Sequence, residues 1–208
     1  MTLAAQTIAS PSETLGASEG RGAARRAMID SQLRVSGINQ EWLLAQFSRV
    51  AREDHVPAAA RGHAYIDRAI PLGTGHALPA PLVQASLLAE AAPQGTERVL
   101  VISPSGYLSA LVEPLVQSVE TIDPTGVIGV QTAATFDLIL IDGAVEHLPE
   151  NLVAALVDEG RVVTGMVLRG VTRLAAGAKT SGGVNLVPLA ELGIPVLREF
   201  AAPKGWSF

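Results

Sequence analysis

Short apolar runs alternate with helical patterns along the second half of the chain, and this alternation restricts the fold more than any other feature. The apolar runs are 99–102, 119–122, 136–141 and 161–168. Helical patterns lie between them, at 108–116 and 149–157. Apolar strands separated by helices are typical of a parallel sheet covered on both faces. The sequence therefore predicts an α/β sheet, with further edge strands, commonly antiparallel, at 184–188 and 195–200.

The first 92 residues show helical spacing instead of strand-like runs. Apolar residues recur every three to four positions in 21–35 and 39–50. Gly37 is a candidate helix stop between them, and Asn39 is a candidate N-cap for the second helix. Residues 81–91 follow as an apolar helix with a proline at its first position.

We divide the chain into three segments. Residues 1–20, rich in Ala, Ser, Thr, Gly and Glu, are expected to form a flexible tail. Residues 21–92 form a helical extension, in which the Pro- and Gly-punctuated stretch 51–80 is a long loop region of the kind that often carries function. Residues 93–208 form the α/β core, and we expect 21–92 to make one compact unit with it.

Composition excludes several classes of partner. The net charge of −5 argues against nucleic acid, which favours a basic face. Cysteine is absent, and the four histidines lack the spacing of metal ligands, so no metal site is expected.

Neither a secretory signal nor a membrane helix is expected. The first 20 residues lack the basic start and the apolar run of a signal peptide. The uncharged stretch 69–89 is interrupted by three prolines, which a membrane helix of this length does not tolerate. We therefore expect a soluble, cytoplasmic protein.

The stretch VLVISPSGYLSAL at 99–111 places a turn between a buried strand and a helix. A nucleotide-binding loop would be rich in glycine here, but the turn retains only Gly106. Pro104 removes one N–H donor, whereas Ser103 and Ser105 keep theirs close to a helix start, where an anionic group can bind.

Six segments together resemble one family. They are ARRAMIDSQLRVSGI, FSRVAREDHVP, HAYIDRAIPLGTGHALPAP, RVLVISPSGYLSAL, FDLILIDGAVEHLPENLVAALVDEGRVV and an ending that runs from LREF to WSF. In this order they resemble the protein-L-isoaspartate O-methyltransferases, a branch of the S-adenosylmethionine-dependent methyltransferases. The resemblance implies a Rossmann-like sheet of seven strands and methyl transfer to the free carboxylate of isoaspartyl residues in damaged proteins. It also implies S-adenosylmethionine at the carboxyl ends of the first strands.

The resemblance places the cofactor loop at Ser103, Ser105, Gly106 and Tyr107. The family has Gly-x-Gly-x-Gly-Tyr here, whereas this loop is one residue shorter and keeps one glycine of three. We expect binding of S-adenosylmethionine to be weak or absent.

Two acidic residues at strand ends are further candidates for cofactor contacts. Asp123 follows the second strand, where a carboxylate commonly holds the ribose hydroxyls. A solvated turn Asp before Pro124 is the alternative reading. Asp142 follows the third strand and is expected to line the same cleft.

The segment between Asp123 and Phe136 has only twelve residues. The family places a helix, a strand and a further connection there, and a single parallel crossover already needs roughly a dozen residues. We therefore predict a sheet shortened by about one strand, with a reduced adenine wall.

The substrate loop that the resemblance implies includes Gly75, His76 and Pro79. Pro79 stands where the family has a serine that is thought to orient the acceptor. His76 can hydrogen-bond an acceptor, although a lone loop histidine is more often exposed.

Two functions follow as hypotheses. The first is an isoaspartyl methyltransferase, or a relative with another carboxylate acceptor. The second is a pseudo-methyltransferase without cofactor that acts through protein contacts, as a possible homodimer.

Overall fold

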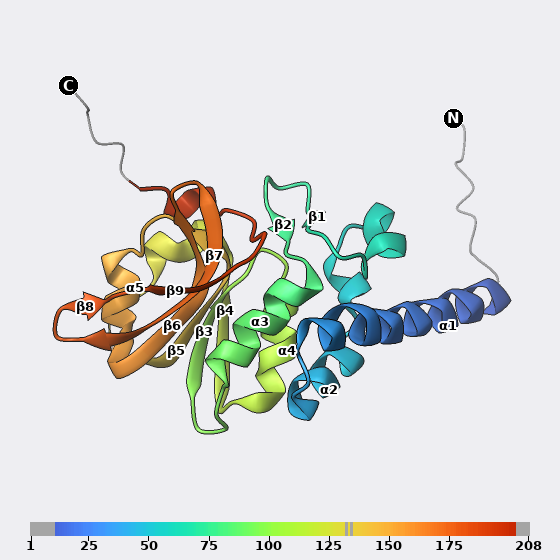
Figure 1. The fold of residues 1–208 in the computed structure, drawn as a ribbon, viewed down its shortest axis with the longest axis horizontal. Coiled ribbons are helices and arrows are strands. Elements are labelled where there is room, and N and C mark those ends of the chain that lie inside the picture. The colour runs from blue at the N-terminus through green and yellow to red at the C-terminus, as the bar shows by residue number, and fades with distance from the viewer. Residues whose placement is uncertain (1–10, 132, 134, 203–208) are drawn as a thin grey trace, which may run out of the picture.

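The computed structural model describes residues 11–131, 133 and 135–202. Its centre is a seven-stranded sheet, and a two-stranded hairpin stands apart from it (Figure 1). The strands are β1 (Ile70–Pro71), β2 (Ala77–Leu78), β3 (Arg98–Ile102), β4 (Ser118–Ile122), β5 (Phe136–Val145), β6 (Leu156–Leu168), β7 (Val171–Thr180), β8 (Gly183–Val184) and β9 (Val187–Glu191). The main sheet has the order β4-β3-β5-β6-β7-β8, and β9 also pairs with β7.

The four strands predicted from apolar runs form the parallel part of the sheet. β3 pairs with β4 and β5, and β5 pairs with β6, all in parallel. Antiparallel pairing begins at β7, which contacts β6 on one side and β8 and β9 on the other. The Rossmann-like α/β fold class predicted from the sequence is therefore confirmed.

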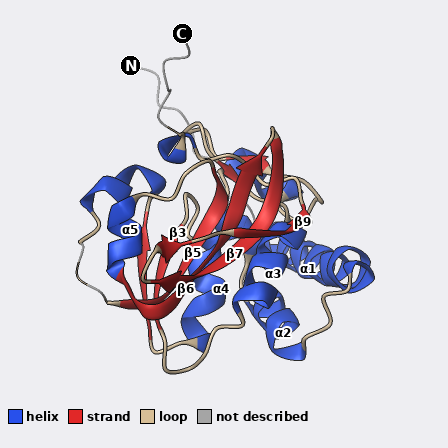
Figure 2. Ribbon diagram, turned by 60° about the vertical axis from the view of Figure 1, so that its left-hand side comes forward, coloured by secondary structure: helices blue, strands red, loops and turns tan. Residues whose placement is uncertain are grey.

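Helices cover both faces of this sheet (Figure 2). The α-helices are α1 (Pro11–Met28), α2 (Glu41–Arg49), α3 (Pro81–Ala91), α4 (Tyr107–Val112) and α5 (Glu150–Ala155). A π-helical turn, η1 (Ile29–Leu33), continues α1. The 3₁₀ helices are η2 (Arg34–Ser36), η3 (Arg52–His55), η4 (Ala58–His63), η5 (Glu113–Leu115), η6 (Pro124–Gly129) and η7 (Arg198–Phe200).

Alternate residues of β3 face two separate cores, because side chains along a strand point to opposite faces. Val99 and Val101 lie in a core shared with α1, α2, α3 and α4. Leu100 and Ile102 lie in the second core, which includes Leu152 from α5. Both faces of the strand are buried, as its continuous apolar run predicted.

The connection between β4 and β5 contains no strand among its described residues. It forms the 3₁₀ helix η6, and residues 132 and 134 lie outside the described part. Within that part, β4 pairs only with β3 and is therefore an edge strand. The described sheet nevertheless has seven strands, so a sheet shortened by about one strand stays a prediction.

The N-terminal region differs from the prediction in two places. Residues 11–20 belong to α1, so the flexible tail is wrong for them, and residues 1–10 lie outside the described part. Gln40, and not Asn39, occupies the N-cap position of α2. Gly37 does end the preceding helical turn, with a φ of 89°.

The edge strand expected at 195–200 is also wrong. This segment makes one isolated parallel bridge, between Val196 and Ala144, and then turns into η7. Leu197 and Phe200 instead pack into the second core, and that burial fixes the segment across the end of β5. The edge strands expected at 184–188 appear as β8 and the start of β9.

None of the helices in the described part of the chain combines the length and the hydropathy needed to cross a bilayer. No group of three or more His, Asp or Glu side chains in the same part is placed to hold a metal ion.

Candidate functional site

The carboxyl ends of β3 and β5 bring Ser103 and Asp142 together. Ile102 pairs with Ile141 in the parallel register, so Ser103, which follows β3, lies beside Asp142, which belongs to the last part of β5. Ser103 Oγ donates a hydrogen bond of 2.8 Å to Asp142 Oδ2. Both side chains are buried, which places this contact under the loop and not on its surface.

The loop after β3 satisfies its own N–H groups. Ser103 Oγ accepts from the N–H of Ser105 at 3.4 Å and of Gly106 at 3.1 Å, and Ser105 Oγ accepts from the N–H of Tyr107 at 3.2 Å. The N–H of Ser103 donates to the carbonyl of Ile122. The donors predicted to be open to an anion are thus already paired. Gly106 keeps the left-handed conformation that the family motif needs, with a φ of 71°.

A chain of buried polar side chains fills the space beneath this loop. Gln84 Nε2 lies 3.0 Å from each carboxylate oxygen of Asp142, and Gln84 Oε1 accepts from Arg52 Nη1 at 2.6 Å. Arg52 also donates to the carbonyls of Ala64 and Pro79. Gln84, Arg52 and Asp142 are all fully buried. The site beside the loop is therefore packed with side chains.

Burial dominates the electrostatics of this network. Removal from water raises the pKa of Asp142 to about 6, although hydrogen bonds from Ser103 and Gln84 and the charge of Arg52 oppose the rise. Burial likewise lowers the pKa of the Arg52 guanidinium.

Tyr107 packs inward instead of lining an open cleft. Its ring lies 5.1 Å from the Arg52 guanidinium carbon and 6.1 Å from the Phe47 ring, and its hydroxyl is buried with no partner among the described residues. His55 makes an edge contact with the same ring, and its Nδ1 lies 3.0 Å from the carbonyl oxygen of Ser105. The candidate role of Tyr107 in cofactor contact stays a prediction.

Asp123 is exposed at the end of β4 and caps the helix that follows. Its Oδ1 accepts from the N–H of Thr125 at 2.9 Å and from the Thr125 hydroxyl at 2.7 Å. These hydrogen bonds lower the pKa of Asp123 and keep it ionised. In the described part of the chain, its other oxygen makes no hydrogen bond. The residue is a turn aspartate, as the alternative reading held, and it still presents a carboxylate to solvent.

His76 is buried, so the reading of it as an exposed loop histidine is wrong. Its Nε2 lies 3.1 Å from Glu199 Oε1, and its Nδ1 lies 3.4 Å from Thr74 Oγ1. Burial alone would raise the pKa of Glu199, but hydrogen bonds from its own N–H and from His76 lower it. The pair joins the predicted substrate loop to η7.

A second contact joins the same two segments. Arg198 Nη2 donates to the carbonyl of Thr74 at 3.0 Å. Gly75 has a φ of 86°, and a Cβ built on it would lie 2.5 Å from Arg198 Nη2. Glycine at this position therefore lets the guanidinium rest on the loop backbone.

A cavity of about 400 Å³, hereafter the loop cavity, lies between the substrate loop and the segment after β9. Its lining residues are Pro71, Gly73, Gly75, His76, Ala77, Pro195, Val196 and Leu197. Pro79 lies outside it and is buried, with its carbonyl accepting from Arg52. The structure thus brings Gly75 and His76 to a cavity, while Pro79 serves the buried network.

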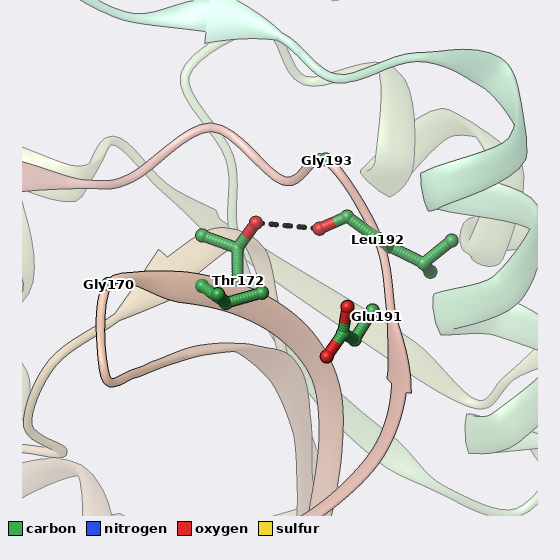
Figure 3. A pocket seen from close by; sticks show the side chains of 6 residues that line it. Gly170, Thr172, Glu191, Leu192 and Gly193 are labelled. Carbon is green, nitrogen blue, oxygen red and sulfur yellow. Dashed lines mark hydrogen bonds between the residues drawn. The ribbon is translucent and has the colours of Figure 1, made fainter.

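Another cavity of about 390 Å³ lies where the start of β7 meets the end of β9 (Figure 3). Thr172 Oγ1 donates to the carbonyl of Leu192 at 2.6 Å across its wall. Glu191 is the one ionisable residue among the six that line it. None of the candidate site residues lies there.

Sequence reasoning missed Arg52, Gln84 and Glu199. Arg52 lies in the quoted segment FSRVAREDHVP, where it opens a run of three charged residues, and such a run is more typical of a solvated surface than of a buried network. Gln84 is a polar residue in the mostly apolar helix α3, and its position among buried apolar residues was the available signal. For Glu199 we find no local signal, because its partner is 123 residues away in the sequence.

Comparison with known proteins decides the family. A family model described as protein-L-isoaspartate(D-aspartate) O-methyltransferase matches residues 23–123. A protein-L-isoaspartate O-methyltransferase 2 from Anaeromyxobacter is 32% identical over 201 residues, which cover 84% of this chain and 83% of that protein. The chain belongs to the protein-L-isoaspartate O-methyltransferase family.

Other protein-L-isoaspartate O-methyltransferases agree with this assignment. The enzyme of Herpetosiphon aurantiacus is 32% identical over 67% of this chain and 74% of its own length. That of Methanoculleus marisnigri is 27% identical over 88% of this chain and 94% of its own length. The resemblance stated from the six segments is thus confirmed.

Solved structures confirm the fold. A putative protein-L-isoaspartate O-methyltransferase from Plasmodium falciparum, in complex with S-adenosyl-L-homocysteine, superposes with a TM-score of 0.66 at 17% identity. The alignment covers 86% of this chain and 98% of that chain. At this identity the likeness concerns the fold alone.

Proposed function

We propose that this chain is a carboxyl methyltransferase that acts on isoaspartyl residues of proteins and holds S-adenosylmethionine weakly. The observation that carries the proposal is the loop cavity: the family's substrate loop closes on the C-terminal segment through two side-chain contacts, His76 with Glu199 and Arg198 with Thr74. Both segments lie at the carboxyl ends of the parallel strands, where open α/β sheets bind ligands.

The residues at the strand ends fit the ribose of S-adenosylmethionine better than its methionine end. The exposed, ionised carboxylate of Asp123 suits the ribose hydroxyls at the end of β4. The loop at Ser103, Ser105 and Gly106 fits the anionic methionine end less well, because serine hydroxyls already accept from its N–H groups. Binding there requires the loop to exchange internal hydrogen bonds for external ones, which lowers the affinity.

When bound, the sulfonium of the donor supplies an activated methyl group. The acceptor is a carboxylate, which is already a nucleophile, so the chain contributes mainly proximity and alignment. Arg198 lies against Gly75, a lining residue of the loop cavity, and its positive charge attracts an acceptor carboxylate in competition with Glu199, whose Oε1 is 3.4 Å from Arg198 Nε. Its fork of N–H donors suits that geometry. The apolar wall at Pro195 and Leu197 excludes water from the same space.

A second candidate function is favoured by the closed loop. Because the N–H groups after β3 are internally paired and buried side chains lie beneath them, the chain can also act as a pseudo-methyltransferase that binds proteins without transferring a methyl group. The cytoplasm and a homodimer stay our predictions for compartment and assembly.

Two measurements separate these functions. The first is calorimetric titration with S-adenosylmethionine, for which we expect weak, saturable binding. The second is transfer of labelled methyl groups to an isoaspartyl peptide, with the matched aspartyl peptide as control. Transfer to the isoaspartyl peptide alone supports the methyltransferase. No detectable binding and no transfer would leave the pseudo-methyltransferase, and a dissociation constant in the low micromolar range would contradict the weakened loop.

A further inference from the structure

The cavity of about 460 Å³ beside the substrate loop, hereafter the flank cavity, has no role in the function proposed above. It lies between the 3₁₀ helix η4 and the residues that lead into β1. Its lining residues are Pro57, Ala59, Ala60, His63, Ile66, Arg68, Ala69, Ile70, Pro71 and Gly73. Most of these are small or apolar, which gives the cavity an apolar interior.

The flank cavity adjoins the loop cavity. Pro71 and Gly73 line both of them, so the backbone after β1 is a shared wall. Gly73 has a φ of 83°, and no atom lies within 4 Å of where a Cβ would be. No side chain therefore rises from the shared wall at this position. A peptide whose isoaspartyl residue occupies the loop cavity therefore passes over Gly73 and reaches the flank cavity.

Arg68 supplies the permanent charge at the rim of the flank cavity. Among its ten lining residues, His63 and Arg68 are the ionisable ones, and both are exposed. The side chain of Arg68 makes no hydrogen bond within the described part of the chain, so its guanidinium is available. An apolar interior with a cationic rim is complementary to an apolar side chain next to an acidic group.

We propose that the flank cavity is a specificity subsite that binds an apolar side chain flanking the isoaspartyl residue of a peptide substrate, with Arg68 selecting a nearby acidic group. The inference rests on the proposed function, since it takes the isoaspartyl residue to occupy the loop cavity. It adds a substrate class: damaged sites within apolar and acidic sequence, in preference to glycine-rich or basic sequence.

The first test measures binding of fluorescent isoaspartyl peptides by anisotropy, without methyl donor. The peptides differ only in the flanking residues, which are Leu and Glu, Gly and Glu, or Leu and Lys. Burial of a leucine side chain predicts that replacing Leu with Gly weakens binding about tenfold. Replacing Glu with Lys should weaken it by a smaller factor that disappears at high salt, because exposed charges are screened.

Variants locate the effect. Ala60→Trp fills the flank cavity and should abolish the preference for Leu, whereas Ala58→Trp, on the same 3₁₀ helix but outside the lining, should retain it. Arg68→Gln should remove the preference for Glu over Lys, and Arg61→Gln is its control. Circular dichroism of each variant verifies that the fold is retained.

The outcomes separate this inference from the proposed function. Binding of isoaspartyl peptides regardless of the flanking residues, or a preference that survives Ala60→Trp, would overturn the subsite and leave the proposed function standing. A flank preference shared equally by isoaspartyl and aspartyl peptides would retain the apolar subsite and overturn isoaspartyl recognition. Failure of every peptide to bind would overturn both.

Discussion

The hydroxyl of Ser103 donates to Asp142 and at the same time accepts from two N–H groups of the loop that it opens. A glycine-rich loop would leave those N–H groups free. Here a side chain replaces the glycines and fixes the turn from beneath. Asp142 is in turn held by Gln84, so the shape of the loop depends on residues of three separate elements.

We predict that Asp142→Asn makes the stability of the protein less dependent on pH. Burial raises the pKa of Asp142 from 3.8 to about 6, so the native state keeps this proton at pH values where the unfolded chain has lost it. The raised pKa of Asp142 therefore lowers the free energy of unfolding of the protein. This loss is absent below about pH 4 and complete above about pH 6, where a pKa shift of roughly two units is worth on the order of 3 kcal/mol. Stability relative to the variant should therefore fall as pH rises through this range.

Urea unfolding of both proteins from about pH 4 to about pH 7 measures this effect. The difference between the two free energies of unfolding removes the contribution of other titrating groups. Parallel profiles would show that the pKa of Asp142 is the same in the folded and the unfolded protein, which would contradict the effect of burial.

Arg52→Met should destabilise the fold by at least about 3 kcal/mol. The variant leaves three buried acceptors without a donor, on Ala64, Pro79 and Gln84, and each such loss costs roughly 1–3 kcal/mol. Arg52→Lys should recover only part of this, because an ammonium group lacks the planar fork. Arg49→Met is the exposed control and should change stability by no more than about 0.5 kcal/mol. If denaturant unfolding gave the same loss of stability for Arg52→Met and Arg49→Met, the buried hydrogen bonds of Arg52 would not stabilise the fold.

Gly143→Ala should displace the C-terminal segment. A Cβ on Gly143 would lie 2.5 Å from Leu197 Cγ, so one of the two must move, at a cost of about 1–3 kcal/mol. The N–H of Ala144, which donates to the carbonyl of Pro195, should exchange with solvent faster. Gly95→Ala, with nothing within 4 Å, is the control. The double variant with Leu197→Ala should restore slow exchange; if it does not, the clash is not the cause.

Asp123→Asn should weaken binding of S-adenosylmethionine by about tenfold, since hydrogen bonds to a charged group are worth roughly 1.5–3 kcal/mol. Glu120→Gln makes the same charge change on β4 and should leave the affinity unaltered. Calorimetric titration of both variants tests the role of the carboxylate. If binding to Asp123→Asn equals that of the unchanged chain, Asp123 serves only to cap η6.

The elements with the strongest local signals could be predicted from the sequence. The apolar runs became β3, β4, β5 and β6, and the helix at 81–91 has the predicted bounds, because a proline fixes its first turn. The segment 195–200 contains Arg198 and Glu199 and formed no strand, because Leu197 and Phe200 pack into the second core instead. Residues 11–20 are polar and carry no apolar stripe, so nothing in their pattern marked the helix.

The candidate site could be predicted only in part. Strand ends indicated Ser103, Asp123 and Asp142, because parallel strands place their carboxyl ends at one edge. The partners that decide what these residues do are remote in sequence: Gln84 is 58 residues from Asp142. Local pattern carries no information about such pairings, which give the Ser103 hydroxyl internal hydrogen-bond partners, and its contact with a cofactor stays a prediction.

The open edge of β4 has a practical consequence for engineering. Its outer side pairs with nothing in the described part of the chain, and the connection to β5 is short. A helix and strand transplanted from a longer relative between residues 129 and 136 would meet a vacant row of backbone donors and acceptors, and would extend the sheet without displacing any described strand. Chimaeras of this kind would add a wall for the adenine ring in one insertion. Comparing their affinity for S-adenosylmethionine with that of the unchanged chain would measure what this wall contributes.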